Sequence, residues 1–161
     1  MLAHPPASRD TGSVAAELVE DALRDRRMEA MQKTPGELAG KRFLVVEDEP
    51  LVALDITAVL ESAGAKVLAT AGKCKEALDI IEREKMDAAL LDANLRGDPV
   101  DVIAAALMNR KIPFLFVTGH EPDSLPPGFR HVSVVSKPFS QTHLLERAAG
   151  LVHEGAGGRL G

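Results

Sequence analysis

Five residues of types that bind cations or anions stand at the ends of short apolar runs: Glu47, Asp48, Asp92, Thr118 and Lys137. Carboxylates held within a few ångströms repel one another and need a cation, and oxygen ligands without Cys or His suit magnesium. The lysine and the hydroxyl remain to bind an anion. Together these groups could hold a phosphoryl group on Asp92, with a metal on one side and Lys137 and Thr118 on the other.

This chemistry requires elements that bring the five residues together. Apolar runs predict buried strands at 42–46, 66–69, 88–91, 113–117 and 132–135, and apolar periodicity predicts helices at 50–64, 73–84, 100–110 and 141–152. Strands that alternate with helices of about 10–14 residues indicate an α/β fold with a doubly wound parallel sheet. Right-handed crossovers place the carboxyl ends of all strands at one edge, where ligands bind. We therefore expect the five residues to meet there.

Each of these residues also has an ordinary structural role that it could play alone. Glu47 and Asp48 would be acids at the start of a helix, and Asp92 a turn residue or helix cap. Thr118 would terminate a strand, and Lys137 would be a surface charge. Their shared placement at strand ends favours one common site.

Composition limits the class of protein. Of the 161 residues, 45% are hydrophobic and 27% charged, as in soluble domains. The net charge of −5 argues against nucleic-acid binding, which needs a basic surface. A single cysteine, Cys74, excludes an internal disulfide and fits a reducing compartment. No apolar run is long enough to span a bilayer or to form a signal peptide. We expect a cytoplasmic protein with no membrane partner.

The amino-terminal segment predicts an extra helix over about 13–33, with apolar residues on one face. Such a helix would either be solvated and marginal or serve in self-association or partner docking. Pro35 and Gly36 end it, and residues 34–40 are predicted to be a linker. A glycine-rich stretch follows the last predicted helix, so residues 153–161 are expected to form a flexible tail.

The strand-end motifs resemble those of the response-regulator receiver family. They are Val45-Val46-Glu47-Asp48-Glu49-Pro50, Leu91-Asp92, Val117-Thr118-Gly119 and Ser136-Lys137-Pro138-Phe139. The resemblance covers residues 41–152 and implies a (βα)5, flavodoxin-like receiver with strand order 2-1-3-4-5. The chain is then expected to comprise an amino-terminal extension (1–40), a receiver domain (41–152) and the tail (153–161).

The resemblance also implies a role for each site residue. Asp92 matches the phosphoacceptor, and Thr118 and Lys137 match the residues that contact the phosphoryl group. Mg²⁺ would be held by Asp48 as main ligand, Glu47 as an acidic neighbour acting through water, Asp92, and the backbone carbonyl of Asn94. The Lys137–Pro138 bond is cis in that family, and X-Pro is where a cis bond is least costly.

Two departures from the common receiver pattern concern the response to phosphorylation. Val134 stands where many receivers carry an aromatic residue that swings when the hydroxyl moves. Three prolines and a glycine interrupt 120–128, so the fourth helix is expected to be irregular or missing. Phe116-Val117-Thr118-Gly119 is similar to the signature of a bacterial subfamily with Phe-Ala-Thr-Gly at this place. Activation is then expected to change the order of 119–130.

The function implied is that of a phosphoacceptor in a two-component relay, a signalling protein rather than an enzyme. It would be phosphorylated on Asp92 by a histidine kinase or histidine phosphotransfer protein. With no output domain in this chain, it would act by contact with a downstream protein target. One alternative is a receiver used only for docking. Another is a haloacid-dehalogenase-like phosphatase, but that family needs a second Asp where this chain has Asn94.

Overall fold

The computed structural model describes residues 17–22, 35–119 and 125–158. The chain separates into two units, Met1–Lys33 and Thr34–Gly161. In the first unit, residues 17–22 are helical, and the apolar side chains of Leu18 and Val19 are exposed. The predicted extra helix is therefore present at these positions, while the rest of 13–33 lies outside the described residues.

The second unit contains a parallel sheet of five strands in the order β2-β1-β3-β4-β5. The strands are β1 (Arg42–Val46), β2 (Lys66–Ala71), β3 (Ala88–Asp92), β4 (Phe114–Thr118) and β5 (Val134–Ser136). The predicted fold class and strand order are confirmed. The pairing aligns Asp92 with Val117 and Thr118 with Ser136, so these strands end side by side.

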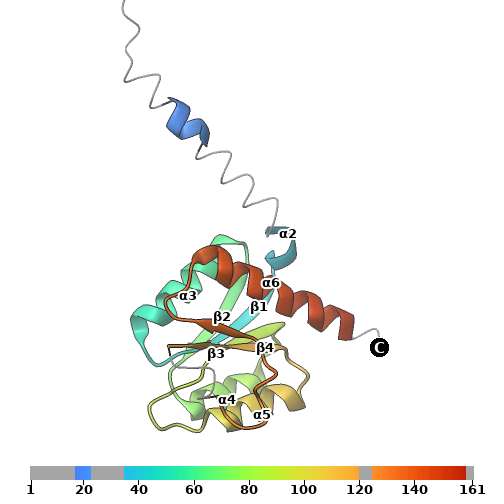
Figure 1. Cartoon of the computed structure of the whole chain (residues 1–161). Coiled ribbons are helices and arrows are strands. Elements are labelled where there is room, and N and C mark those ends of the chain that lie inside the picture. The colour runs from blue at the N-terminus through green and yellow to red at the C-terminus, as the bar shows by residue number, and fades with distance from the viewer. Residues whose placement is uncertain (1–16, 23–34, 120–124, 159–161) are drawn as a thin grey trace, which may run out of the picture. The chain divides into compact units, whose positions relative to one another are not determined.

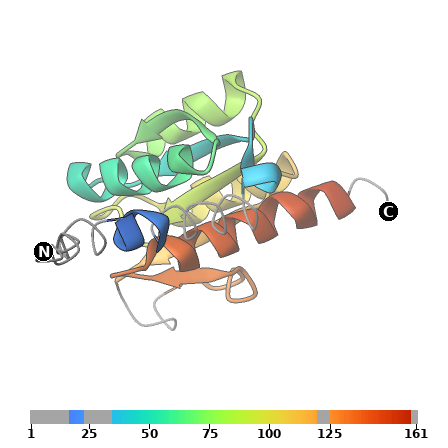
Figure 2. The same cartoon turned by 90° about the horizontal axis from the view of Figure 1, so that it is seen from above.

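Helices cover both faces of the sheet. They are α2 (Pro35–Leu38), α3 (Pro50–Ser62), α4 (Cys74–Arg83), α5 (Val100–Asn109) and α6 (Gln141–Gly158). Figure 1 shows α3 and α6 on one face and α4 and α5 on the other. Figure 2 shows the same layers from above, with α6 running along the sheet. Of the helices that the structure describes, none is long and apolar enough to cross a membrane.

Strand alternation divides the core into two layers. Val45 and Leu90 pack in the cluster beneath α3 and α6, whereas Leu44, Leu91 and Phe116 pack in the cluster against α4 and α5. Successive side chains of a strand point to opposite faces, so a strand covered on both sides is apolar throughout. Every residue of β3 and β4 is accordingly buried. This packing fixes the strand ends at which the polar residues stand.

The segment between β4 and β5 contains no helix among its described residues, 119 and 125–133. The N–H of Phe129 bonds to the carbonyl of Pro126 in a turn, and the Leu125 side chain is buried in the core. The Phe129 ring lies 6.4 Å from that of Phe114. The prediction of a missing fourth helix is confirmed at these positions.

The last helix is longer than predicted. It was expected to end at residue 152 but runs to Gly158, so six residues assigned to a flexible tail are helical. Glycine lowers helix propensity by only about 1 kcal/mol per residue, which an established helix can absorb. Strand ends also differ by one or two residues, as is usual.

The segment predicted as a linker packs on the core instead. Residues Pro35–Leu38 form the short helix α2, and Leu38 is fully buried in the cluster beneath α3 and α6. The N–H of Gly40 bonds to the carbonyl of Gly64 at 2.9 Å. Gly64 has a φ of +87°, and its Cα faces Ala39 so closely that a Cβ would lie 3.3 Å from the Ala39 Cα.

Leu38→Ala is expected to lower the free energy of unfolding by about 2–5 kcal/mol, because it removes a fully buried side chain and leaves a cavity. Urea denaturation followed by circular dichroism measures this. Leu54→Ala is the matched control, because Leu54 on α3 is 65% exposed and should cost less than about 0.5 kcal/mol. A loss in Leu38→Ala as small as that in the control would show that the Leu38 side chain adds nothing to the stability of the fold.

Candidate functional site

The carboxyl ends of the strands bring the predicted site residues to one edge of the sheet. Glu47 and Asp48 follow β1, Asp92 ends β3 and Lys137 follows β5. Thr118 ends β4, where its side chain is fully buried and its carbonyl accepts a bond from the N–H of Lys137 at 2.8 Å. These positions arise because each crossover returns the chain to the same side of the sheet.

Lys137 joins two of the carboxylates. Its ammonium donates to Oε2 of Glu47 at 2.8 Å and to Oδ2 of Asp92 at 3.3 Å. The other Asp92 oxygen, Oδ1, accepts the backbone N–H of Asn94 at 2.9 Å. The Lys137–Pro138 bond is cis, as the resemblance implied. The Asp92 carboxylate is therefore held from two sides while it still borders a cavity.

Burial affects the pKa values of Glu47 and Lys137. Desolvation raises the pKa of Glu47 from 4.5 to about 7, although bonds from Lys137 and from the Glu49 N–H oppose it. Desolvation lowers the pKa of Lys137, but its bond to Glu47 and the charges of Asp92 and Glu47 outweigh this and raise it overall. Lys137 thus remains a cation beside the carboxylates.

The residues also fit a divalent cation. Glu47, Asp48 and Asp92 each offer an oxygen, and these oxygens lie within 4.8 Å of one another. Oδ2 of Asp48 is buried and accepts no hydrogen bond from the described residues. A buried carboxylate oxygen without a donor is costly, and a hard cation would satisfy it. The three predicted carboxylate ligands therefore lie close together, and their roles as ligands, like that of the Asn94 carbonyl, stay predictions.

Sequence reasoning missed one cation at this site. The Nε atom of Arg96 lies 3.0 Å from Oδ2 of Asp48 as an ion pair, with a geometry that forms no hydrogen bond. Arg96 also borders the cavity, of about 140 Å³, together with Asp48, Glu49, Asp92, Asn94, Gly119 and Lys137. The signal in the sequence is that Arg96 and Gly97 follow closely after Asp92, where the glycine indicates a turn.

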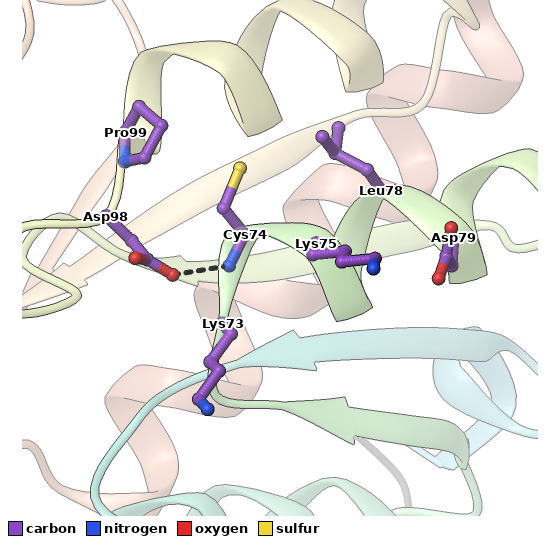
Figure 3. A pocket seen from close by; sticks show the side chains of 7 residues that line it. All are labelled: Lys73, Cys74, Lys75, Leu78, Asp79, Asp98 and Pro99. Carbon is purple, nitrogen blue, oxygen red and sulfur yellow. Dashed lines mark hydrogen bonds between the residues drawn. The ribbon is translucent and has the colours of Figure 1, made fainter.

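A second hollow, of about 460 Å³, lies where α4 begins and holds none of the predicted site residues (Figure 3). Here Oδ2 of Asp98 accepts the N–H of Cys74 at 2.7 Å and caps α4. Burial, followed by the charges of Asp98 and Asp101, raises the pKa of the Cys74 thiol. The thiol is therefore a poor nucleophile at neutral pH, and the contact serves to fasten the loop after β3 to α4.

The fold and the acidic edge together define an α/β domain with an acidic cluster at the carboxyl end of a parallel sheet, and comparison with known proteins identifies the family. Residues 43–149 match the model of the response regulator receiver domain. The chain belongs to this family, whose members act in two-component signalling.

Three known proteins are similar to this chain. PdtaR, a transcriptional regulatory protein of Mycobacterium tuberculosis, is 28% identical over 109 residues, which are 65% of this chain and 53% of PdtaR. The BeF3-activated solution structure of SdrG from Pseudomonas melonis Fr1 is 38% identical, with a TM-score of 0.62, and covers 71% of this chain and 98% of SdrG. The chain spans about half the length of the curated relatives it matches.

The third is the receiver domain of the sensor histidine kinase PA1611 from Pseudomonas aeruginosa PAO1. Its crystal structure contains a magnesium ion coordinated in the active-site cleft. It is 26% identical, with a TM-score of 0.57, and covers 70% of this chain and 99% of that domain. The acidic cluster of the present chain thus resembles a magnesium site of its family.

Proposed function

We propose that this chain is a phosphoacceptor of a two-component relay and that Asp92 receives the phosphoryl group. The observation that carries the proposal is the Lys137 ammonium, which contacts the Asp92 carboxylate beside an acidic cluster able to bind a divalent cation. Lysine and cation would balance the charge that accumulates when a phosphoryl group reaches a carboxylate.

The chemical step is a transfer between two nucleophiles. A carboxylate oxygen of Asp92 attacks the phosphorus of a phosphohistidine, a P–O bond forms, and the P–N bond breaks with its electron pair leaving on the imidazole. The N–H of Asn94 orients one carboxylate oxygen. The Lys137 ammonium would bind the incoming phosphoryl group, and the Thr118 hydroxyl is expected to bind it as well. Bound Mg²⁺ would neutralise charge on the transferred group.

We also propose the metal ligands, the phosphodonor, the output and the subfamily. Mg²⁺ would be held by the carboxylates of Glu47, Asp48 and Asp92 and by the backbone carbonyl of Asn94. The donor would be a histidine kinase or a histidine phosphotransfer protein in the cytoplasm, and the output a contact with a downstream protein. Phe116-Val117-Thr118-Gly119 supports membership of the subfamily with a Phe-Ala-Thr-Gly-like signature.

The domain assignment also remains a proposal. The receiver would span 41–152, preceded by an extension whose helix, within 13–33, serves self-association or partner docking. The exposed Leu18 and Val19 in the described part of that helix support a binding role.

The test is phosphorylation by a small donor. With acetyl phosphate and Mg²⁺, the intact protein is expected to gain about 80 Da, one phosphoryl group, in a mass spectrum recorded at low temperature. Prior removal of divalent metal with EDTA should prevent the gain, since the carboxylate cluster then lacks its cation. If no adduct forms with acetyl phosphate or with a panel of histidine kinases, the chain is a docking-only receiver.

A further inference from the structure

We infer that Arg96 is a built-in counter-cation for Asp48, which holds that carboxylate in the metal-free protein and competes with Mg²⁺ for it. The inference rests on the proposed function, because it takes Asp48 as a metal ligand. It concerns how tightly the site binds metal, and it assigns a role to a residue outside the predicted ligand set.

The contact joins the two residues at the site that the metal would use. Nε of Arg96 lies 3.0 Å from Oδ2 of Asp48, the same oxygen that is buried and accepts no hydrogen bond from the part of the chain that the structure describes. The Asp48 side chain is only 14% exposed, whereas that of Arg96 is 77% exposed. The arginine therefore covers the carboxylate from the solvent side and can swing away without leaving a cavity.

The backbone at Arg96 supports a specific role for this side chain. Its φ is +50°, and that of Gly97 is +92°, so Leu95–Asp98 forms a tight turn with two consecutive left-handed residues. Glycine or asparagine suits such a position better than arginine, which carries a steric cost there. The left-handed turn thus fixes the direction in which the Arg96 side chain leaves the backbone, and in this conformation the side chain reaches Asp48.

The turn is also anchored, so that Arg96 is presented at a fixed place. Leu95 is buried, and Oδ1 of Asn94 accepts the N–H of Arg96 at 3.2 Å. At the other end, Asp98 caps α4 through Cys74 (Figure 3). Both ends are thus tied to the domain on which the acidic cluster stands, and only the exposed arginine side chain is free to leave.

Mg²⁺ and the Arg96 guanidinium would compete for Asp48, because both are cations that need the same carboxylate. A cation bound to Asp48 would have to break the ion pair, and the positive guanidinium nearby would repel it. An exposed ion pair contributes little free energy, so the effect on metal affinity should be modest. Once displaced, the guanidinium would stand at the rim of the 140 Å³ cavity that Asp92 and Lys137 also line.

The test is a calorimetric titration of the full-length protein with MgCl₂ alone, with no phosphodonor. Arg96→Ala is expected to bind Mg²⁺ about twofold to fivefold more tightly than the unaltered protein at low salt. Arg96→Lys keeps the charge and should remain close to the unaltered protein. Arg83→Ala is the matched control, because it removes the same charge from the last turn of α4, away from the acidic cluster. Added salt should reduce the difference made by Arg96→Ala.

The outcomes separate this inference from the proposed function. Equal affinities in Arg96→Ala and Arg83→Ala, or weaker binding in Arg96→Ala, would overturn the role of Arg96 while leaving the phosphoacceptor intact. If Asp48→Ala binds Mg²⁺ as well as the unaltered protein, the metal assignment itself fails, and the inference fails with it. Circular dichroism of each variant shows whether it is folded.

Discussion

Asp92→Asn protein is expected to show no gain of mass when it is incubated with acetyl phosphate and Mg²⁺. The amide that replaces the carboxylate has nearly the same size but no anionic oxygen to attack phosphorus. The Asp92 carboxylate is the group on which the contacts converge, since Lys137 holds Oδ2 and Asn94 holds Oδ1. Intact-protein mass spectrometry measures the adduct directly.

The control for this substitution is Asp101→Asn, which likewise replaces a carboxylate by an amide, at an exposed position in the first turn of α5. It should be labelled as fully as the unaltered protein. Asp92→Asn should also keep its circular dichroism spectrum, because removal of one of three clustered carboxylates relieves repulsion. An adduct that persists in Asp92→Asn would show that another residue is the acceptor.

Much of the fold could be predicted because its signals are local. The apolar runs that became β3 and β4 are buried on both faces, and such strands are recognisable as continuous apolar segments. The prolines and the glycine after Gly119 interrupt any regular helix, and residues 125–130 are indeed not helical. The strand order came from the resemblance, since the crossover rule fixes handedness but not which strands are neighbours.

What sequence reasoning did not predict depends on tertiary contacts. Leu38 stands in a short Pro- and Gly-containing stretch that is typical of a linker, and only its burial beneath α3 and α6 makes it part of the core. The end of α6 at Gly158 likewise contradicts the local propensity of a glycine-rich sequence. Propensity is a weak guide wherever packing or an established helix opposes it.

The residues of the candidate site also differ in whether their positions can be predicted from the sequence. Glu47, Asp92 and Lys137 each follow a strand, so the parallel sheet brings them together wherever the helices lie. Arg96 stands four residues beyond Asp92, and its contact with Asp48 depends on a turn with two left-handed residues. Gly97 indicates a turn, but the direction in which the arginine points cannot be deduced from its position in the chain.

Asp48→Ala is expected to weaken Mg²⁺ binding by at least about tenfold, and phosphorylation by acetyl phosphate should fall with it. Asp48 offers one of the three oxygens that lie within 4.8 Å of one another, and its Oδ2 is buried with no hydrogen-bond donor among the described residues. Glu47 is paired with Lys137, which is largely buried, whereas Asp48 is paired with Arg96, whose exposed side chain can move away, so Asp48 is the carboxylate more readily available to a metal. Calorimetry with MgCl₂ gives the affinity without any phosphodonor.

Glu49→Ala is the matched control, because it removes the same charge from the next residue of the chain. Glu49 is exposed, and its backbone N–H, which the substitution keeps, is what bonds to Glu47. Its Mg²⁺ affinity should therefore change by less than about threefold, the size of a screened surface charge. Equal losses in the two variants would show that the acidic pair has been placed one residue out of register, and that Glu49 rather than Asp48 faces the metal.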